Sequence, residues 1–238
     1  YKRQMVNILK SIRFMGTHGE CVVISTPESS KPFICLGLGK STSISQQTIR
    51  SGFAACSKFC QKKNIDDVVI VHPSTSTQQD SVDWLKAAVY GLHMGVYQCQ
   101  KYKHTTADTA TYQATIHHYH AIESDIMPSI RAIDALVAGN YLAKDLMHAP
   151  PNILYPMAFA DKMMQLTTYG CSVNVLDEAA LTQENMHSLL AVGKGSSRES
   201  ALVTIFWPGS NPNTSLPPVA LVGLSLIHIS EPTRLSGI

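Results

Sequence analysis

The stretch that decides the organisation of this chain is Tyr-Leu-Ala-Lys-Asp-Leu-Met-His-Ala-Pro-Pro-Asn-Ile-Leu-Tyr-Pro, residues 141–156. A long helical pattern precedes it and must end at Pro150 and Pro151. Proline has no N–H to donate, and it forces the residue before it out of the helical region. A new apolar segment then runs from Met157 to Leu166. The stretch therefore ends one helix, makes a turn and begins a second structural unit, although Pro-Pro-Asn by itself is ordinary turn sequence.

Composition excludes several classes of protein. The 238 residues suffice for one large domain or two small ones, and the 45% of apolar residues can bury a core. The net charge is +2, without a basic stripe, so we expect no nucleic-acid partner. No apolar run approaches the eighteen or so residues of a membrane span, so no membrane is expected either.

The start of the chain and its cysteines point to a cytoplasmic protein. Tyr1–Gln4 leads into no apolar segment of the signal-peptide kind and contains no initiator Met, so we expect a longer reading frame without a signal peptide. Cys21 and Cys35 lie in strand-like runs, whereas Cys56 and Cys60 share one helix face. This placement is typical of reduced core cysteines in the cytosol.

The first half alternates strands with helices. Short apolar runs at Cys21–Thr26 and Phe33–Gly37 indicate strands, and the β-branched run Val68–Val71 is typical of a strand buried on both faces. We therefore predict an α/β fold with a mostly parallel sheet in residues 1–122. Two helical faces support this alternation: Ile49, Phe53, Cys56 and Cys60, then Leu85, Ala88, Leu92, Val96 and Cys99.

A possible phosphate loop occurs at Gly37–Thr42, with the sequence Gly-Leu-Gly-Lys-Ser-Thr. A P-loop requires a further glycine at position 34, where this chain has Ile34. The glycine fingerprint of dinucleotide sites fails as well, because position 42 is Thr. We therefore interpret the segment as a turn from strand to helix, with Ser43 as the N-cap.

Three histidines, His117, His118 and His120, cluster without a nearby carboxylate or cysteine. Histidines of this kind can bind zinc or copper. In a strand, however, His118 and His120 share one face and His117 points to the other. We predict a surface strand and not a metal site.

The second half begins with a linker helix over residues 123–148, for which Asp125 is a candidate cap and Pro128 lies in the first turn. Apolar residues on two sides predict packing on both sides. One stripe is Ile130, Ile133, Val137 and Tyr141, and the other is Ala132, Leu136, Gly139 and Leu146. Beyond the turn we predict a helix over 157–168, strands at 173–176 and 202–207, a strand or buried segment at 189–196, and a strand from Val219.

Several motifs in this half, taken together, resemble the leucine (cytosol) aminopeptidase family. They follow the family in order and spacing, and the match is firm over about residues 130–223. A looser match to the same family covers residues 20–103. They are Lys144-Asp145-Leu146, Pro150–Leu154, Val175–Glu178, Met186–Ser196 and Val219–Gly223.

The resemblance implies a fold and an activity. Family members hydrolyse the N-terminal residue of peptides with two divalent metal ions, Mn or Zn, and they assemble as homo-hexamers in the cytoplasm. The resemblance also implies a macro-like N-terminal domain and an α/β metallopeptidase catalytic domain. Two non-catalytic alternatives stay open, a macro-like module that binds ADP-ribose and an oligomerisation module.

The residues that this chemistry needs are missing from the sequence. The family's metal-binding lysine belongs at position 224, where this chain has Leu224, and the other ligands and catalytic residues lie further downstream. Val192–Gly195 matches an earlier structural glycine turn of the family, and Asp177 and Glu178 suit a helix start. We therefore expect no catalytic, metal-binding or cofactor-binding residue here, and an inactive 238-residue chain.

The last residues depart from the family pattern. Residues 224–234, Leu-Ser-Leu-Ile-His-Ile-Ser-Glu-Pro-Thr-Arg, resemble the translation of a sequencing adapter. We therefore divide the chain into an N-terminal α/β domain (1–122), a linker helix (123–148), a truncated start of the catalytic domain (149–223) and a non-native tail (224–238).

Overall fold

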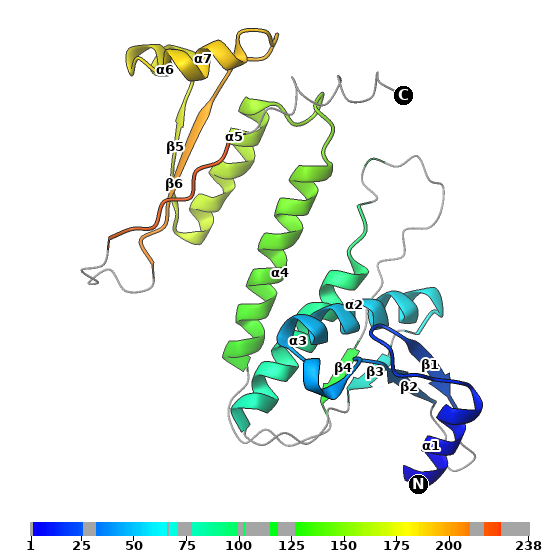
Figure 1. Ribbon diagram of the computed structural model, residues 1–238. Helices are drawn as coiled ribbons and strands as arrows, with labels where there is room; N and C mark the ends of the chain where they lie inside the picture. Colours follow the sequence, from blue (N-terminus) through cyan, green and yellow to red (C-terminus); the bar gives the residue numbers. More distant parts are fainter. Residues whose placement is uncertain are drawn as a thin grey trace. The chain divides into compact units, whose positions relative to one another are not determined.

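The computed structural model describes residues 2–25, 32–65, 67–70, 78–99, 102, 115–118, 127–209 and 217–224 (Figure 1). It contains two compact units, Tyr1–Asp145 and Leu146–Ile238. The fold is mixed α/β with small two-stranded sheets, which confirms the predicted class. Some expectations fall outside the described residues, namely those for Thr26, Val71, His120, Asp125 and the tail from 225 onward.

The first unit begins with helix α1 (Lys2–Ser11), which the sequence patterns did not indicate, and continues into a hairpin. Strands β1 (Cys21–Ile24) and β2 (Phe33–Leu36) pair antiparallel, with Cys21 opposite Leu36. The predicted parallel arrangement is wrong here. Only residues 25–32 separate the two strands, whereas a parallel pair needs a crossover of about a dozen residues or more.

A parallel pair does occur further along the chain. Strand β3 (Asp67–Ile70) lies parallel to β4 (Thr115–His118), with helix α3 (Gln78–Val96) between them in sequence. The predicted alternation ran from Phe33–Gly37 to Val68–Val71, but β2 and β3 lie in different two-stranded sheets, and the parallel unit forms between β3 and β4 instead. His117 and His118 belong to β4, opposite Val69 and Ile70 in the ladder.

Helix α2 (Gln46–Lys62) packs against α3, and together they form the main core of the first unit. Its N-cap is Ser45, whose hydroxyl accepts the Thr48 N–H at 3.2 Å. The prediction of Ser43 as the cap is wrong, because Ser43 closes a preceding 3-10 turn, η1 (Ser41–Ser43). The predicted apolar face is confirmed. The buried residues of this core are Ile49, Phe53, Ala87 and Ala88.

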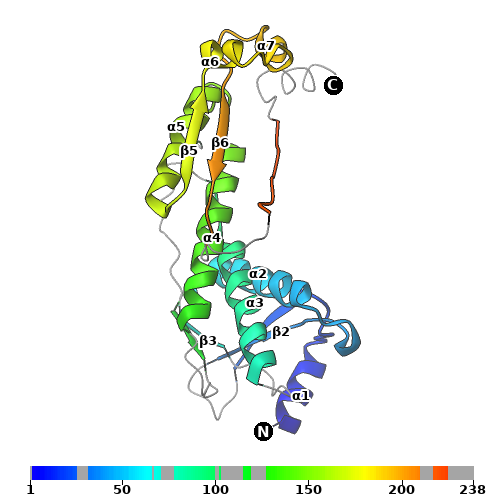
Figure 2. The ribbon, with the colours of Figure 1, turned by 90° about the vertical axis from the view of Figure 1, so that its left-hand side faces the viewer.

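Small residues allow α2 and α3 to approach closely (Figure 2). A Cβ added at Gly91 would lie 2.2 Å from the Arg50 carbonyl oxygen, and one at Gly95 would lie 2.0 Å from Ser57 Oγ. Both distances are far below van der Waals contact, so only glycine fits at these two positions. The Trp84 ring packs against this core and meets Phe53 edge-on at a centroid distance of 5.3 Å.

Helix α4 (Met127–His148) packs against α3 along its predicted first stripe. The buried contacts are Leu85 and Val89 on α3 with Ile133 and Val137 on α4. Two residues of the second stripe make little contact with the described residues: Leu136 is 47% exposed, and a Cβ at Gly139 would meet no atom within 4 Å. The first unit therefore buries one side of this helix.

The second unit is built on a two-stranded antiparallel sheet. Helix α5 (Pro156–Met164) starts with proline at its first turn and runs into η2 (Gln165–Tyr169). Gly170, with φ of 82°, ends η2 in a left-handed conformation that glycine adopts without strain. Strands β5 (Ser172–Leu176) and β6 (Leu202–Phe206) confirm the predicted strands.

Two short helices connect these strands, α6 (Glu178–Gln183) and α7 (His187–Gly193). The prediction of a strand or buried segment over 189–196 is wrong, because α7 covers residues 189–193 and none of residues 189–196 is buried. A short apolar run does not distinguish a strand from a helix, and the Leu-Leu-Ala composition of Leu189–Ala191 favours a helix.

Residues 217–224 form no strand with any described residue. Val219 is 87% exposed, Leu221 95% and Val222 96%. The predicted strand from Val219 is therefore not formed, since a strand requires a partner to complete its ladder. Among the described helices, none is both long enough and apolar enough to cross a membrane.

Candidate functional site

The turn after α4 is closed by its own backbone. The N–H groups of Ile153 and Leu154 both donate to the Pro150 carbonyl at 2.9 Å. Ala149 and Leu154 are buried on either side of the two prolines. The predicted helix stop is confirmed, and the turn fixes the direction in which the chain enters α5.

The residues just before this turn tie α4 to the end of α3. The Tyr97 hydroxyl donates to Asp145 Oδ1 at 2.7 Å, and Lys144 Nζ lies 4.7 Å from the centroid of the Tyr97 ring. The Tyr141 hydroxyl donates to the His93 carbonyl. Burial, and then the hydrogen bond to Asp145, raise the pKa of Tyr97. Lys144 and Asp145, which belong to the family motif, thus hold the helix in place.

The two adjacent carboxylates of the second unit are both engaged by backbone N–H groups. Asp177 Oδ1 accepts the Ala180 N–H at 2.8 Å and caps α6. Glu178 Oε1 accepts the Ser200 N–H at 2.8 Å. The predicted helix start at these residues is confirmed, and their carboxylates stabilise the fold.

The Val-Gly-Lys-Gly sequence also has a structural role. A Cβ at Gly193 would lie 1.8 Å from Ser200 Oγ, so the turn packs tightly against Ser200. The Ser196 N–H donates to the Gly193 carbonyl at 2.9 Å. The Lys194 side chain is exposed. This geometry agrees with the interpretation of residues 192–195 as a glycine turn.

The Arg198 guanidinium lies 4.4 Å from the centroid of the Tyr155 ring. Tyr155 is the N-cap residue of α5. The cation–π contact therefore connects the segment after α7 to the beginning of the second unit.

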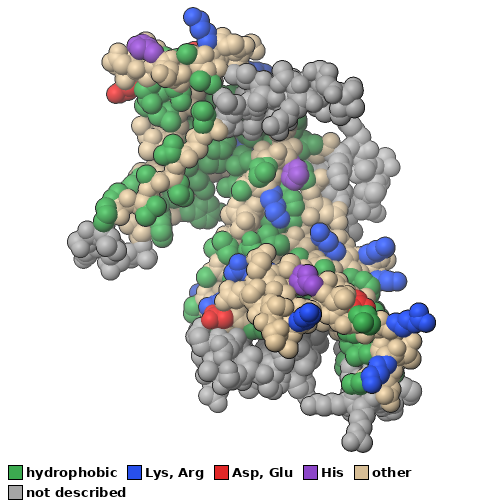
Figure 3. Space-filling model, in the orientation of Figure 1, with side chains coloured by type: hydrophobic (Ala, Val, Ile, Leu, Met, Phe, Trp, Pro, Cys, Tyr) green, Lys and Arg blue, Asp and Glu red, His purple; other side chains and the backbone are tan. Residues whose placement is uncertain are grey.

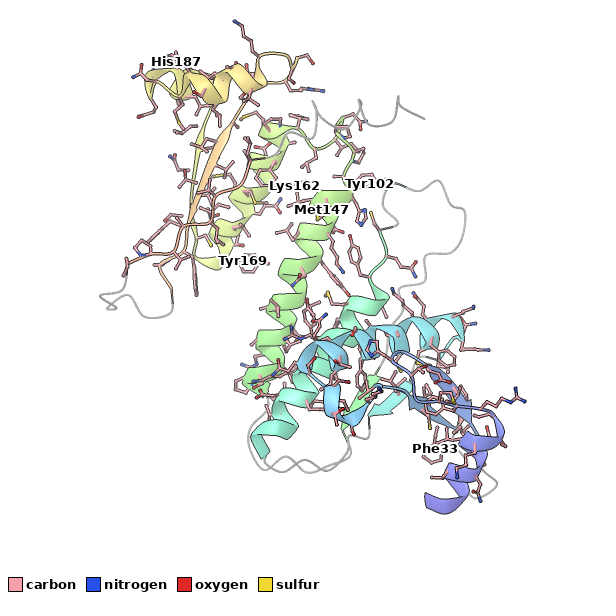
Figure 4. The ribbon with its side chains drawn as sticks, in the orientation of Figure 1. Phe33, Tyr102, Met147, Lys162, Tyr169 and His187 are labelled. Carbon is pink, nitrogen blue, oxygen red and sulfur yellow. The ribbon has the colours of Figure 1, made fainter. Side chains whose placement is uncertain are left out.

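A two-metal centre does not fit the part of the chain that the structure describes. That part contains no group of three or more His, Cys, Asp or Glu side chains able to hold a metal ion. Figure 4 places His187 at the start of α7 and Tyr169 at the opposite end of the same unit. Leu224, at the position of the expected lysine, is 66% exposed.

The sequence matches both domains of one protein family. The pattern of the cytosol aminopeptidase family, N-terminal domain, matches residues 1–106, and that of the catalytic domain matches residues 141–229. Together these ranges cover most of a mixed α/β chain with two units, so the chain belongs to the cytosol aminopeptidase family. The catalytic match continues six residues past Gly223.

Curated relatives agree with this assignment. A probable cytosol aminopeptidase of Clostridium perfringens is 31% identical over 232 residues, which is 94% of this chain and 47% of the relative. Another from Nitrobacter winogradskyi is 30% identical over 216 residues, 89% of this chain and 42% of the relative. The chain thus spans less than half the length of these relatives.

Solved structures share the fold. A tomato leucine aminopeptidase mutant superposes with a TM-score of 0.75 at 19% identity, covering 84% of this chain and 40% of that one. The bottromycin maturation enzyme BotP in complex with Mn gives a TM-score of 0.65 at 21% identity, covering 83% and 41%. At these identities the likeness establishes the fold alone.

Proposed function

We propose that the whole protein is a leucyl aminopeptidase that hydrolyses the N-terminal residue of peptides in the cytoplasm as a homo-hexamer. The observation that carries this proposal is the order of the two family matches on one chain, with α4 and the Pro-Pro turn between them. The described chain contributes the N-terminal domain and the start of the catalytic domain.

The proposed chemistry uses two divalent ions, Mn or Zn, which polarise a carbonyl and activate water. The described residues do not fit such a centre, because Asp177 and Glu178 already bind backbone N–H groups. We therefore assign no catalytic step to this chain and propose that the 238-residue polypeptide is inactive. Its Pro-Pro turn, Arg198–Tyr155 contact and α6 cap would position the beginning of the catalytic domain.

An activity assay tests this proposal. The purified chain is incubated with a leucyl peptide and Mn²⁺, Zn²⁺ or Co²⁺, next to a full-length relative as positive control. We expect leucine release from the relative and none from the chain. Metal-dependent release by the chain itself would contradict the proposed inactivity and would require ligands that we have not identified.

We also propose that the N-terminal domain ends at residue 122, the linker helix at 148 and the start of the catalytic domain at 223. A non-native tail would then begin at Leu224. The catalytic match through residue 229 weighs against that last boundary. Amplification of the locus from source DNA across the Gly223 codon decides the question. We expect Lys-Gly codons next; if Leu-Ser-Leu-Ile-His reappears in genomic DNA, the tail is genuine.

A matching assay then tests the function of the whole protein. If the amplified locus continues the reading frame, the longer protein should release leucine from a leucyl peptide with Mn²⁺. Failure of a folded, metal-loaded longer protein to cleave any N-terminal residue would overturn the aminopeptidase proposal itself.

A further inference from the structure

Three free cysteines meet in the first unit, where the first hairpin packs on α2. Cys56 and Cys60 lie on one face of α2 and are 5% and 1% exposed, whereas Cys21 begins β1 and is half-buried. The pKa of Cys56 is raised first by its neighbours Cys21 and Cys60, which places the three thiols close together. Neither the family assignment nor the proposed peptidase function involves this cluster.

The backbone explains why the cluster forms. A Cβ at Gly19 would lie 3.4 Å from Ala55 Cβ, so the chain entering β1 touches α2 one residue before Cys56. A Cβ at Gly52 would lie 3.8 Å from Leu36 Cδ2, and Leu36 is the ladder partner of Cys21. Because paired residues project from the same face of a hairpin, Cys21 faces α2.

The contacts make the three thiols chemically different. Hydrogen bonding to Cys56 lowers the pKa of Cys21 and likewise that of Cys60. The same hydrogen bonds, followed by burial, raise the pKa of Cys56. Reaction with an external oxidant requires a thiolate that solvent can reach. Cys21 alone of the three combines a favoured thiolate with partial exposure.

We propose that Cys21 and Cys56 form a reversible hydroperoxide-sensitive pair that closes into a disulfide between β1 and α2. The Cys21 thiolate attacks the terminal oxygen of a hydroperoxide; an S–O bond forms, the O–O bond breaks, and the alcohol or water leaves with a proton. Cys56 sulfur then attacks Cys21 sulfur, an S–S bond forms, the S–O bond breaks and water leaves. Two thiols lose two electrons and two protons, and the peroxide is reduced.

Helix geometry disfavours the alternative pair within α2, Cys56 with Cys60. Side chains four residues apart on a helix have Cβ atoms about 5–6 Å apart. A disulfide requires Cβ atoms about 3.5–4.5 Å apart. A Cys56–Cys60 bond would therefore distort α2, and Cys60 remains a thiol beside the new disulfide.

Cys35 provides a control within the same hairpin. It pairs with Val22 and so projects from the face opposite to Cys21. Burial raises the pKa of the Cys35 thiol. Cys35 is half-buried like Cys21, but it lies on the other side of the sheet.

The test is a peroxide titration of the full 238-residue chain, followed by thiol capping and peptide mapping without reduction. Trypsin cleaves after Lys58 and so separates Cys56 from Cys60. A glutamate-specific protease cleaves after Glu28 and separates Cys21 from Cys35. We expect one dominant cross-linked pair, Cys21 with Cys56, which disappears on treatment with a dithiol.

Variants sharpen the result. Cys21→Ser should abolish the cross-link, whereas Cys35→Ser should leave it unchanged. A second measurement needs no variant: in the native chain, Cys21 should be alkylated about tenfold faster than Cys35 because of its greater thiolate fraction. Any of three results would overturn the proposal. They are cross-links of Cys35 or Cys171 at the same yield as Cys21–Cys56, the absence of a Cys21–Cys56 link, and equal alkylation rates for Cys21 and Cys35.

Discussion

Among the described residues, the first unit has helices on two sides of its central helix α3, whereas in the second unit one helix, α5, packs against both strands of the sheet. In the first, α3 contacts α2 through Phe53 and neighbouring residues, and α4 through Val89 and Val137. In the second, α5 contacts β5 and β6. Exposed apolar side chains nevertheless remain on and just after β6: Ile205 is 42% exposed, Phe206 53% and Trp207 64%. Figure 3 shows hydrophobic side chains over this region.

This difference bears on stability. A two-stranded hairpin is marginally stable in water and gains stability from further strands or from a packed helix. The second unit has one such helix, and residues 217–224 add exposed apolar side chains without pairing. Exposed patches of this kind mark interaction surfaces or cause aggregation. We therefore expect the second unit to depend on further protein surface for its stability.

The largest effect should come from the core of the first unit. Phe53→Ala removes a buried ring from the contact with Trp84, and we expect it to lower the free energy of unfolding by about 3–5 kcal/mol. Phe206→Ala, at a residue that is 53% exposed, should change it by about 0.5 kcal/mol or less. Urea unfolding followed by circular dichroism checks both; similar losses would remove the contrast between the units.

Glycine substitutions test how closely the helices approach. Gly91→Ala places a Cβ 2.2 Å from the Arg50 carbonyl oxygen and should cost about 1–3 kcal/mol, because backbone must move. Gly139→Ala meets no atom within 4 Å and should raise the free energy of unfolding by about 0.5–1 kcal/mol. An unchanged or raised thermal midpoint for Gly91→Ala would show that α3 is not packed as described.

Loss of a cap measures the local stability of the second unit. Asp177→Ala removes the carboxylate that accepts the Ala180 N–H and should cost about 0.5–2 kcal/mol. Asp177→Asn keeps an acceptor and should cost much less. Hydrogen exchange of the α6 amides distinguishes the two; equal protection in both variants would mean that the cap does not hold the helix.

The smallest expected effect is a pH dependence in the loop before β1. Burial by itself would raise the pKa of Glu20. Hydrogen bonds from Thr17 and Met15 outweigh burial and hold this pKa below its ordinary value. The carboxylate therefore stabilises the fold above a pH of about 4.3, the ordinary value for glutamate. That contribution is lost as the pH falls through the lowered folded-state pKa. Amide shifts of residues 15–17 should follow this titration in the native chain and not in Glu20→Gln.

Local sequence patterns predicted the helices well and the pairing of strands less well. The face of α2, the stop at Pro150 and the cap at Asp177 follow from periodicity, proline chemistry and acceptor placement. The antiparallel direction of β1 and β2 was missed, although the short connection between them signals it. The contact of Cys21 with Cys56 depends on tertiary packing, which no local pattern encodes. The identity of α7 was missed because short apolar runs suit strands and helices alike.

The difference in stability between the two units can be measured directly, because each contains one of the two tryptophans, Trp84 and Trp207. The variants Trp207→Phe and Trp84→Phe leave one fluorescent reporter in each unit, and urea unfolding of both follows the units separately. We predict a sharp transition at Trp84 and a broader transition at lower urea at Trp207. A single sharp transition that coincides for both reporters in a soluble monomer would contradict the account.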